Sequence, residues 1–349
     1  MKKIVALLLA LVMVLGLAAC ASSSDTTSDE DVNVEFGGET ETADTETDTS
    51  AETETDASAE TETDASAETD TSAEAETSDT VEIPAAPDLT DVDTSAIPGV
   101  EDGVLTVGME CVYAPYNWTQ LDDSNGAVPI ANNPGSYANG YDVQMAKRIC
   151  EAYGWELEVM ALGWDGLNPA LSAGTIDAVI AGQSMTETRL QEVDMAGPYF
   201  YASIVCVTKA DSPLASATGI SQLTGTCTAQ TGTIWYTSCL PQIAGAEIMP
   251  EAETAPAMVM AVESGTVDFI CTDMPTALGA CATYDDLVVL DFSGTDDDFE
   301  VDEGEINIGI SVLKGNTALK DAINAVLENL TAEHFNALMD QAIAIQPAV

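Results

Sequence analysis

The chain has very few basic residues. It contains 8 Lys and Arg against 60 Asp and Glu in 349 positions, and two of the eight lie in the first twenty residues. Residues 21–100 hold 25 of the acids and no base, so residues 101–349 carry the other 35 acids against six bases, a charge of about −29. Nucleic acid and anionic membrane surfaces are poor partners for such a domain, because charges of the same sign repel.

Residues that bind transition metals are scarce as well. The sequence has one histidine, His334, and no CxxC motif, so we expect no zinc site and no other cofactor. Of eight cysteines, one is Cys20 and seven lie in the rest of the chain, an odd number for an exported protein. Several of the seven lie in apolar runs, where Cys behaves as a small hydrophobic residue. Cys227 and Cys239 are close enough in sequence for a local bridge, and the sequence does not decide whether they form one.

Long apolar runs are absent except at the N-terminus. Lys2 and Lys3 precede an apolar run over residues 4–17, which is shorter than the about 20 residues of a membrane span. The run ends in LAAC at residues 17–20, which resembles a bacterial lipobox, so Cys20 is predicted to be lipidated and to become the mature N-terminus. The alternative is an ordinary secretory signal with an incidental cysteine. Both interpretations predict export.

Residues 21–96 are a low-complexity acidic segment. A TDASAETE-like unit recurs every eight residues, beginning at Thr47, Thr55 and Thr63, and Phe36 is the one aromatic residue between residues 21 and 100. Such a composition cannot bury enough apolar surface to offset the entropy of ordering. We interpret it as a disordered tether, on the order of 50 Å in span, between a lipid anchor and a folded domain.

The remaining sequence alternates strand and helix patterns. A strand at 104–108 is followed by a helix at 142–153 that ends at Gly154, a strand at 156–160 and a helix at 167–173. This order predicts an α/β fold with a parallel sheet. After an acidic loop, residues 306–313 form a further strand, and helices are expected at 317–330 and 332–343.

An internal similarity predicts two lobes. LSAGTIDAVIAG at residues 171–182 and VESGTVDFICTD at 262–273 share a helix end, a glycine and a buried strand. If each copy belongs to one lobe, the two strand ends face each other, and ligands of open α/β sheets bind beyond such ends.

Four stretches of the chain resemble the amino-acid-binding receptors of bacterial ABC importers, solute-binding protein family 3. They are VLTVGMECVYAPYNWTQ (104–120), GYDVQMAKRICEAYG (140–154), WDGLNPALSAGTIDAVIAGQSMTETR (164–189) and ALMDQAIAIQP (337–347). The resemblance implies the two-lobed periplasmic-binding-protein fold of type 2, with a ligand cleft between the lobes. We place the signal peptide at 1–20, lobe 1 at 97–208 and 304–349, and lobe 2 at 209–303. Two hinge crossovers are expected near 206–209 and 303–308.

The resemblance assigns the two ends of a zwitterionic ligand to opposite lobes. Arg189 would bind the α-carboxylate through its planar pair of donors, assisted by Ser184 and the amides of residues 182–184, Gly182 included. Asp273 would accept the α-ammonium. The alternatives are that Arg189 forms a surface ion pair with Glu187 or Glu192, and that Asp273 caps a helix before Pro275.

Further residues are assigned to the rest of the ligand. By the resemblance, Tyr113 and Trp164 would enclose its side chain, unless one of them is a core ring. Thr231 and Thr233 lie at a strand-to-helix turn that can donate to the carboxylate, although Thr233 alone would also serve as an N-cap. By the same resemblance, Glu110 would contact the ligand side chain and favour a polar or basic amino acid; the alternative is that Glu110 is a solvated loop acid without such a contact. Ala181 and Gly182 replace serines common in the family, and the loop 122–139 is long.

The sequence therefore predicts a monomeric, lipid-anchored receptor on the outer face of the membrane. It would deliver a free amino acid to an ABC permease driven by a cytoplasmic ATPase, and it would not be an enzyme. A cyclohexadienyl-type dehydratase on the same fold is one alternative, for which Glu110 or Asp273 would supply the general acid. An amino-acid sensor or adhesin at the cell surface is another.

Overall fold

A computed structural model describes residues 81–347 of the chain. Cys20, and the acidic repeat up to residue 80, lie outside the described residues, so the predictions of a lipid anchor and of a tether there are not tested by it. Within the described part of the chain, no helix is long and apolar enough to cross a membrane.

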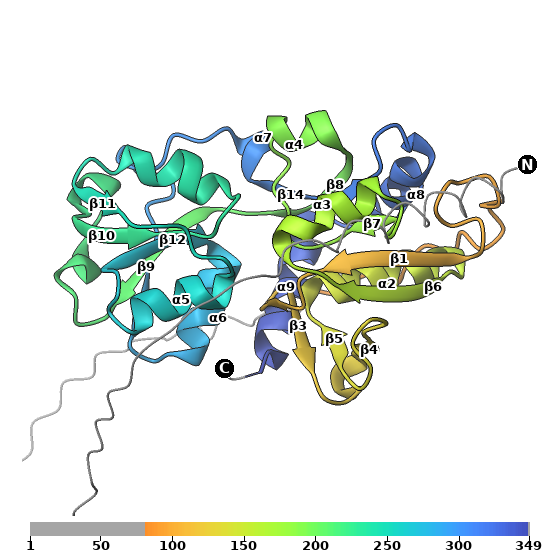
Figure 1. The fold of residues 1–349 in the computed structure, drawn as a ribbon, viewed down its shortest axis with the longest axis horizontal. Coiled ribbons are helices and arrows are strands. Elements are labelled where there is room, and N and C mark those ends of the chain that lie inside the picture. Colours follow the sequence, from red (N-terminus) through yellow and green to blue (C-terminus); the bar gives the residue numbers. More distant parts are fainter. Residues whose placement is uncertain (1–80, 348–349) are drawn as a thin grey trace, which may run out of the picture. The chain divides into compact units, whose positions relative to one another are not determined.

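Two five-stranded mixed sheets form the cores of two lobes (Figure 1). The first has the order β6 (Glu156–Ala161), β1 (Val104–Met109), β7 (Ala178–Val179), β14 (Asn307–Val312) and β8 (Asp194–Tyr201). The second has the order β11 (Ala246–Ile248), β10 (Gly225–Thr228), β12 (Phe269–Asp273), β9 (Ile204–Lys209) and β13 (Leu287–Leu290). In each sheet one strand runs opposite to the other four, and it pairs on both sides with antiparallel neighbours. This strand is β14 in the first sheet, between β7 and β8, and β9 in the second, between β12 and β13.

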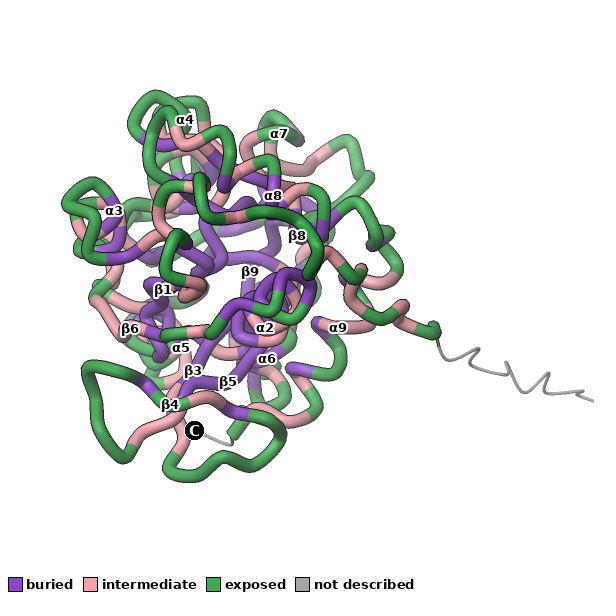
Figure 2. The backbone as a smooth tube through the Cα atoms, turned by 90° about the vertical axis from the view of Figure 1, so that its right-hand side faces the viewer, coloured by how far each residue is buried: buried purple, intermediate pink, exposed green. Residues whose placement is uncertain are grey.

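Helices complete the two lobes. They are α2 (Tyr141–Tyr153), α3 (Trp164–Ser172), α4 (Glu187–Glu192), α5 (Ala255–Glu263), α6 (Met274–Thr283), α7 (Glu303–Ile306), α8 (Thr317–Leu327) and α9 (Ala332–Ile345). Gly154 ends α2 in the left-handed conformation, as its position after the apolar stripe predicts. α9 packs against α2 and β8 of the first lobe and against α6 of the second. The buried segments, purple in Figure 2, run through the interior, and α4 and α7 lie at the surface.

The two copies of the internal similarity lie in different lobes. The first copy runs from the end of α3 into β7 of the first sheet, and the second runs from the end of α5 into β12 of the second sheet. Gly174 and Gly265 occupy equivalent turns, with φ angles of 68° and 71°. The structure therefore confirms the fold class and the two-lobed arrangement that this similarity predicts.

The first crossover differs from the prediction. β9 pairs along its length with β12 and β13, so residues 204–208 belong to lobe 2, and the chain crosses at 202–203, between β8 and β9. The apolar run at 204–208 reads equally well as a strand of either lobe, and its pairing partners are distant in sequence. The chain returns to the first sheet through α7 into β14.

The predicted tether is too long at its C-terminal end. Residues 81–100 lie against lobe 1, where Ile83, Leu89 and Ile97 are partly buried on the core. The Arg148 Nη2 atom donates hydrogen bonds to the carbonyls of Pro84 and Ala85, at 2.6 and 2.8 Å. The acidic composition of this segment predicts disorder. Its few apolar residues nevertheless make packing against lobe 1 favourable.

The long loop at 122–139 contributes two short strands, β4 (Val128–Pro129) and β5 (Tyr137–Asn139), to a third sheet. This sheet has the order β2 (Val112–Tyr113), β3 (Asn117–Gln120), β5 and β4. A parallel bridge between Ile130 and Val159 attaches it to the edge of the first sheet.

Cysteines and the single histidine have structural positions. The seven cysteines among the described residues are free thiols, so no bridge joins Cys227 and Cys239. Cys206 and Cys271 face each other across β9 and β12, and both are buried. His334 completes a capping box with Thr331 at the start of α9. No group of three or more possible metal ligands occurs in residues 81–347.

We expect Arg148→Ala to release the segment 81–89 from lobe 1. Loss of two charge-assisted hydrogen bonds should cost about 1–2 kcal/mol locally, and limited proteolysis after Glu82 should accelerate several-fold. Lys147→Ala is the matched control, because Lys147 donates to the Gly126 carbonyl instead. Equal cleavage of wild type and both variants would show that Arg148 does not hold the segment.

Candidate functional site

The loops that follow the strands of both sheets meet in a cleft. β1, β6 and β7 of lobe 1 lead to the turns at residues 110–113, 162–164 and 180–184. β10 and β12 of lobe 2 lead to residues 229–235 and to Asp273. A cavity of about 20 Å³ lies between the turns, with room for about one water molecule. Its lining residues are Tyr113, Trp164, Gly182, Ser184, Thr186 and Arg189 from lobe 1, and Gln230, Gly232, Thr233, Ile234 and Trp235 from lobe 2.

Arg189 provides the positive charge of this cavity. The Thr186 side chain caps α4 by accepting the Arg189 backbone N–H at 3.2 Å, which fixes the start of the helix that carries the guanidinium. One guanidinium nitrogen, Nη1, donates to the Ser184 carbonyl, and the guanidinium carbon lies 5.6 Å from the Trp164 ring centroid. Burial lowers the pKa of Arg189 to about 10, so it is charged at neutral pH.

No carboxylate pairs with Arg189 in the described part of the chain. The ion pairs there involve Lys209 and Lys314, with nitrogen–oxygen distances of 2.5–3.0 Å. The surface pair with Glu187 or Glu192 that the sequence left open is therefore not formed. In a domain so rich in acids, an unpaired half-buried guanidinium is able to bind an anion.

Two glycines allow aromatic rings to approach the cavity closely. At Gly232, whose φ is 66°, a Cβ atom would lie 2.9 Å from Trp164 Nε1 of the other lobe. At Gly182, whose φ is 63°, it would lie 2.7 Å from Tyr113 Cε1. A serine at 182 would therefore displace the Tyr113 ring. The Gly182 N–H itself donates to the Tyr199 hydroxyl at 3.1 Å, so this amide is already engaged within lobe 1.

Asp273 lies behind Tyr113 rather than on the cavity wall. It caps α6, where its Oδ1 accepts the Thr276 N–H at 3.0 Å. Its Oδ2 accepts the hydroxyls of Tyr116 at 2.8 Å and Tyr113 at 3.3 Å. Burial raises the pKa of Asp273, and the hydrogen bonds from these residues oppose that rise. Arg189 and Asp273 thus belong to opposite lobes, with Tyr113 between the cavity and Asp273.

The two threonines point to different places. Thr233 lines the cavity, and its hydroxyl donates to the Gln230 carbonyl at 2.7 Å. The Thr231 hydroxyl donates to Glu251 at 2.9 Å, and Thr231 lines a neighbouring pocket. The turn continues into the π-helical segment η4 (Trp235–Cys239) instead of a regular α-helix.

A larger acidic pocket adjoins the cavity. Its volume is about 570 Å³, and it is lined by Glu110, Asp165 and Glu253 together with Trp164 and Thr231. Trp164 lines both the cavity and the pocket. Among the described residues that line the cavity and the acidic pocket, Arg189 is the one basic residue. The space therefore has a positive end at Arg189 and a negative end at the three carboxyls.

Glu110 is the buried member of this acidic group. Only 6% of its surface is exposed, and its Oε2 atom has no hydrogen-bond partner among the described residues. Burial raises the pKa of Glu110 to about 7; Gln230 opposes the rise, and Asp142 and Asp165 add to it. Gln230 Nε2 is likewise buried and makes no hydrogen bond of normal geometry to the described residues, although the Gln230 side chain lies close enough to Glu110 to oppose the rise of its pKa. A buried polar atom without a partner is costly, so both atoms are suited to contact a bound molecule.

Sequence reasoning missed part of this lining. It did not include Thr186, Gln230, Gly232, Ile234 and Trp235 of the cavity, or Asp165 and Glu253 of the acidic pocket. Asp165 and Gln230 are sequence neighbours of the predicted residues Trp164 and Thr231. This adjacency could have indicated that they line the same site. Glu253 had none, because it comes from lobe 2, whereas most of the pocket lining comes from lobe 1.

Comparisons with known proteins agree with this architecture. The model of the family "Bacterial extracellular solute-binding proteins, family 3" matches residues 105–343. A probable histidine-binding protein of Neisseria gonorrhoeae is 26% identical over 243 residues, which are 68% of this chain and 81% of that protein.

Solved structures show the same fold. The arginine-bound form of a truncated ArgBP from T. maritima is 28% identical, with a TM-score of 0.53, over 66% of this chain and 98% of that one. An amino-acid ABC transporter substrate-binding protein from Streptococcus pneumoniae, bound to L-arginine, is 23% identical, with a TM-score of 0.59, over 70% of this chain and 95% of that one.

The family match covers more than half of the chain and both five-stranded sheets except Val104, the first residue of β1. It is a family of solute-binding proteins and not of enzymes, so the dehydratase alternative is not retained. Together with the two lobes and the charged cleft between them, the match shows that the chain belongs to the bacterial extracellular solute-binding proteins, family 3.

Proposed function

We propose that this protein captures a free cationic amino acid outside the cell and delivers it to an ABC permease. The observation that carries the proposal is the polarity of the cleft, which has one unpaired guanidinium at one end and three carboxyls at the other. A zwitterion with a cationic side chain has the complementary charges. The histidine-binding relative and the two arginine-bound structures add support.

Arg189 is the proposed site of the α-carboxylate. Its planar guanidinium offers two parallel donors, and Ser184 and Thr233 line the same cavity from the two lobes. Gly182 is proposed to contact the ligand through its Cα atom, next to the Tyr113 ring, since its N–H donates to Tyr199. Asp273 is the proposed partner of the α-ammonium, which would approach it past Tyr113.

The acidic pocket is the proposed site of the side chain. A guanidinium or ammonium group there would lie among Glu110, Asp165 and Glu253, beside the Trp164 ring. It would supply Glu110 Oε2 with the donor that it lacks among the described residues. The Trp164 and Tyr113 rings would contact the methylene groups, and Trp164 adds cation–π attraction. Thr231 lines this pocket and is a further proposed contact.

Binding requires the lobes to move apart and close again. The 20 Å³ cavity beside Arg189 is far smaller than an amino acid. The two crossovers, at 202–203 and at α7, are the connections about which such a movement would occur. A ligand that contacts both lobes favours the closed arrangement, which is the form a permease would recognise.

We expect Arg189→Ala to abolish measurable binding of L-arginine. Loss of one partner of a partly buried ion pair should cost about 3 kcal/mol, or more than a hundredfold in affinity. Isothermal titration calorimetry measures this, with Arg148→Ala as the control because Arg148 is the other arginine of the chain and lies outside the cleft. Affinity within tenfold of wild type in Arg189→Ala would refute the assignment.

We expect the protein to prefer L-arginine over its uncharged analogue L-citrulline by at least tenfold. Glu110→Gln should remove most of that preference. Because the pKa of Glu110 in the free protein is about 7, affinity for L-arginine should fall as the pH drops below 7, and Glu110→Gln should flatten this dependence. Calorimetry between pH 5.5 and 8.5 tests both. Equal binding of the two ligands at every pH would contradict the cationic side-chain site.

The same proposal places the protein at the membrane through a lipid on Cys20. Wild-type protein expressed in a bacterium that processes lipoproteins should partition into the detergent phase, and Cys20→Ala should stay in the aqueous phase. Recovery of both from the aqueous phase would support an ordinary secretory signal instead. The acidic segment after Cys20 would then separate the anchor from the receptor domain.

A further inference from the structure

Four buried side chains join the two lobes behind the cleft. Tyr113 and Tyr116 come from lobe 1, and Asp273 and Thr276 come from lobe 2. The Tyr116 hydroxyl donates to Asp273 Oδ2 at 2.8 Å, and the Tyr113 hydroxyl donates to the same atom at 3.3 Å. The Thr276 hydroxyl donates to the Tyr113 hydroxyl at 3.2 Å. All of these contacts are between protein atoms.

Burial makes these hydrogen bonds matter for lobe closure. Tyr116 is 0%, Asp273 1%, Tyr113 2% and Thr276 3% exposed, so water does not compete for the Asp273 carboxylate in the closed arrangement. Hydrogen bonds to a charged acceptor are stronger than those between neutral groups, especially where water is excluded. Separation of the lobes would break all of the contacts between the two phenols and Asp273 at once.

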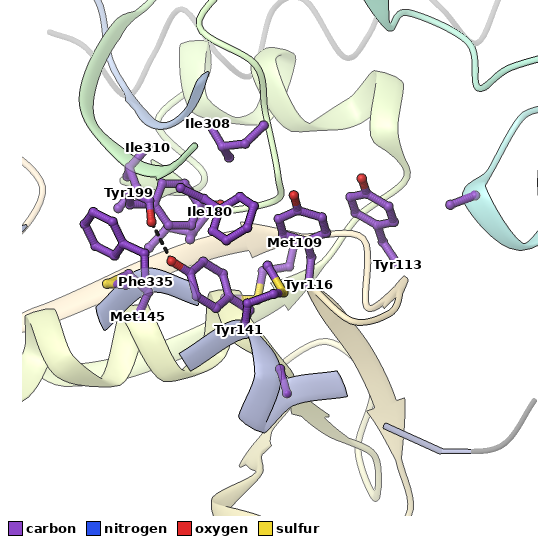
Figure 3. Close-up of a cluster of buried hydrophobic side chains, with 14 of the residues drawn as sticks. Met109, Tyr113, Tyr116, Tyr141, Met145, Ile180, Tyr199, Ile308, Ile310 and Phe335 are labelled. Carbon is purple, nitrogen blue, oxygen red and sulfur yellow. Dashed lines mark hydrogen bonds between the residues drawn. The ribbon is translucent and has the colours of Figure 1, made fainter. Parts of the chain in front are cut away.

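Packing holds the two phenols in place for this contact. The rings of Tyr113 and Tyr116 stack with centroids 4.8 Å apart, and their hydroxyls point in the same direction (Figure 3). The edges of Tyr141 and Phe200 pack against Tyr116, each at 6.2 Å between centroids. Little side-chain entropy is therefore lost when lobe 2 brings Asp273 to the hydroxyls.

Lobe 2 presents the carboxylate with equal order. Asp273 is the N-cap of α6 and accepts the Thr276 N–H through its other oxygen. Its position at the end of β12 is fixed by the pairing of Asp273 with Ile204 of β9, next to the crossover at 202–203. Because Asp273 and the phenols belong to opposite lobes, a movement of the lobes about the crossover changes the distance between them.

We propose that Tyr113, Tyr116 and Asp273 form a clamp that closes the lobes in the absence of ligand, with Tyr116 as the residue that positions the carboxylate. The clamp sets how much of the free protein is closed and therefore how much must open before a ligand enters. If the proposed function holds, the ligand ammonium replaces the Tyr113 hydroxyl as a donor to Asp273, because that hydrogen bond is the longer of the two. The hydrogen bond from Tyr116 to Asp273 remains.

Single-molecule energy transfer on the ligand-free full-length protein tests the clamp. Dyes are attached through encoded keto amino acids at Thr188 on α4 and Thr237 on η4, both exposed and one on each lobe. Labelling through keto groups leaves the free cysteines of the protein unmodified. We expect wild type to be mostly in the state with the shorter dye separation, and Tyr116→Phe to lower the closed-to-open ratio at least tenfold.

Tyr141→Phe is the matched control. It removes a buried hydroxyl from the same aromatic cluster, but that hydroxyl donates to the Tyr199 carbonyl within lobe 1. Its closed-to-open ratio should stay within threefold of wild type. If Tyr116→Phe does not unfold cooperatively, Tyr113→Phe makes the same test, with an expected decrease of at least threefold.

Two outcomes would overturn the clamp. One is a wild-type protein that is mostly open without ligand. The other is a distribution that does not change in Tyr113→Phe or Tyr116→Phe. No amino acid is added in this experiment, so its result does not depend on which ligand the protein binds, and failure of the clamp would leave the proposed function untouched.

Discussion

The rest of the site depends on one guanidinium that has no carboxylate partner in a strongly acidic domain. Arg189 is half-buried, charged and held by Thr186, Ser184 and Trp164, none of which neutralises it. The cost of leaving this charge unpaired is reduced when an anion enters from the cleft. The surrounding acids repel most anions. A ligand that carries positive groups as well as a carboxylate is therefore favoured, and a cationic amino acid is such a ligand.

The fold directs the other charges to the same cleft as this one. Each lobe ends its parallel strands at the cleft, so β1 and β7 present Glu110 and the 182–184 turn, and β12 presents Asp273. Lobe closure then brings the acidic pocket and the cavity into contact along Trp164. In the proposed clamp, Tyr113 and Tyr116 hold Asp273 across the lobes. Lobe closure would then depend on contacts within the protein as well as on contacts with the ligand.

Local patterns predicted the fold class and part of the cavity lining, and contacts between distant segments explain what was missed. The glycine-ended helices and buried strands repeat in both lobes, so Arg189 and Asp273 could be placed in opposite lobes from sequence. The sequence could not place β9 in lobe 2, because this placement depends on pairing with strands 60 or more residues away. Glu253 likewise depends on contacts between distant segments. The acidic composition of residues 81–96 does not reveal that Ile83 and Leu89 pack on the core.

A crystal structure of the protein with L-arginine bound tests the central claim most directly. The account predicts that both carboxylate oxygens of the ligand lie about 2.7–3.2 Å from guanidinium nitrogens of Arg189, with the ligand side chain among Glu110, Asp165 and Glu253. A ligand outside the cleft, or one in the reverse orientation with its carboxylate away from Arg189, would contradict the account.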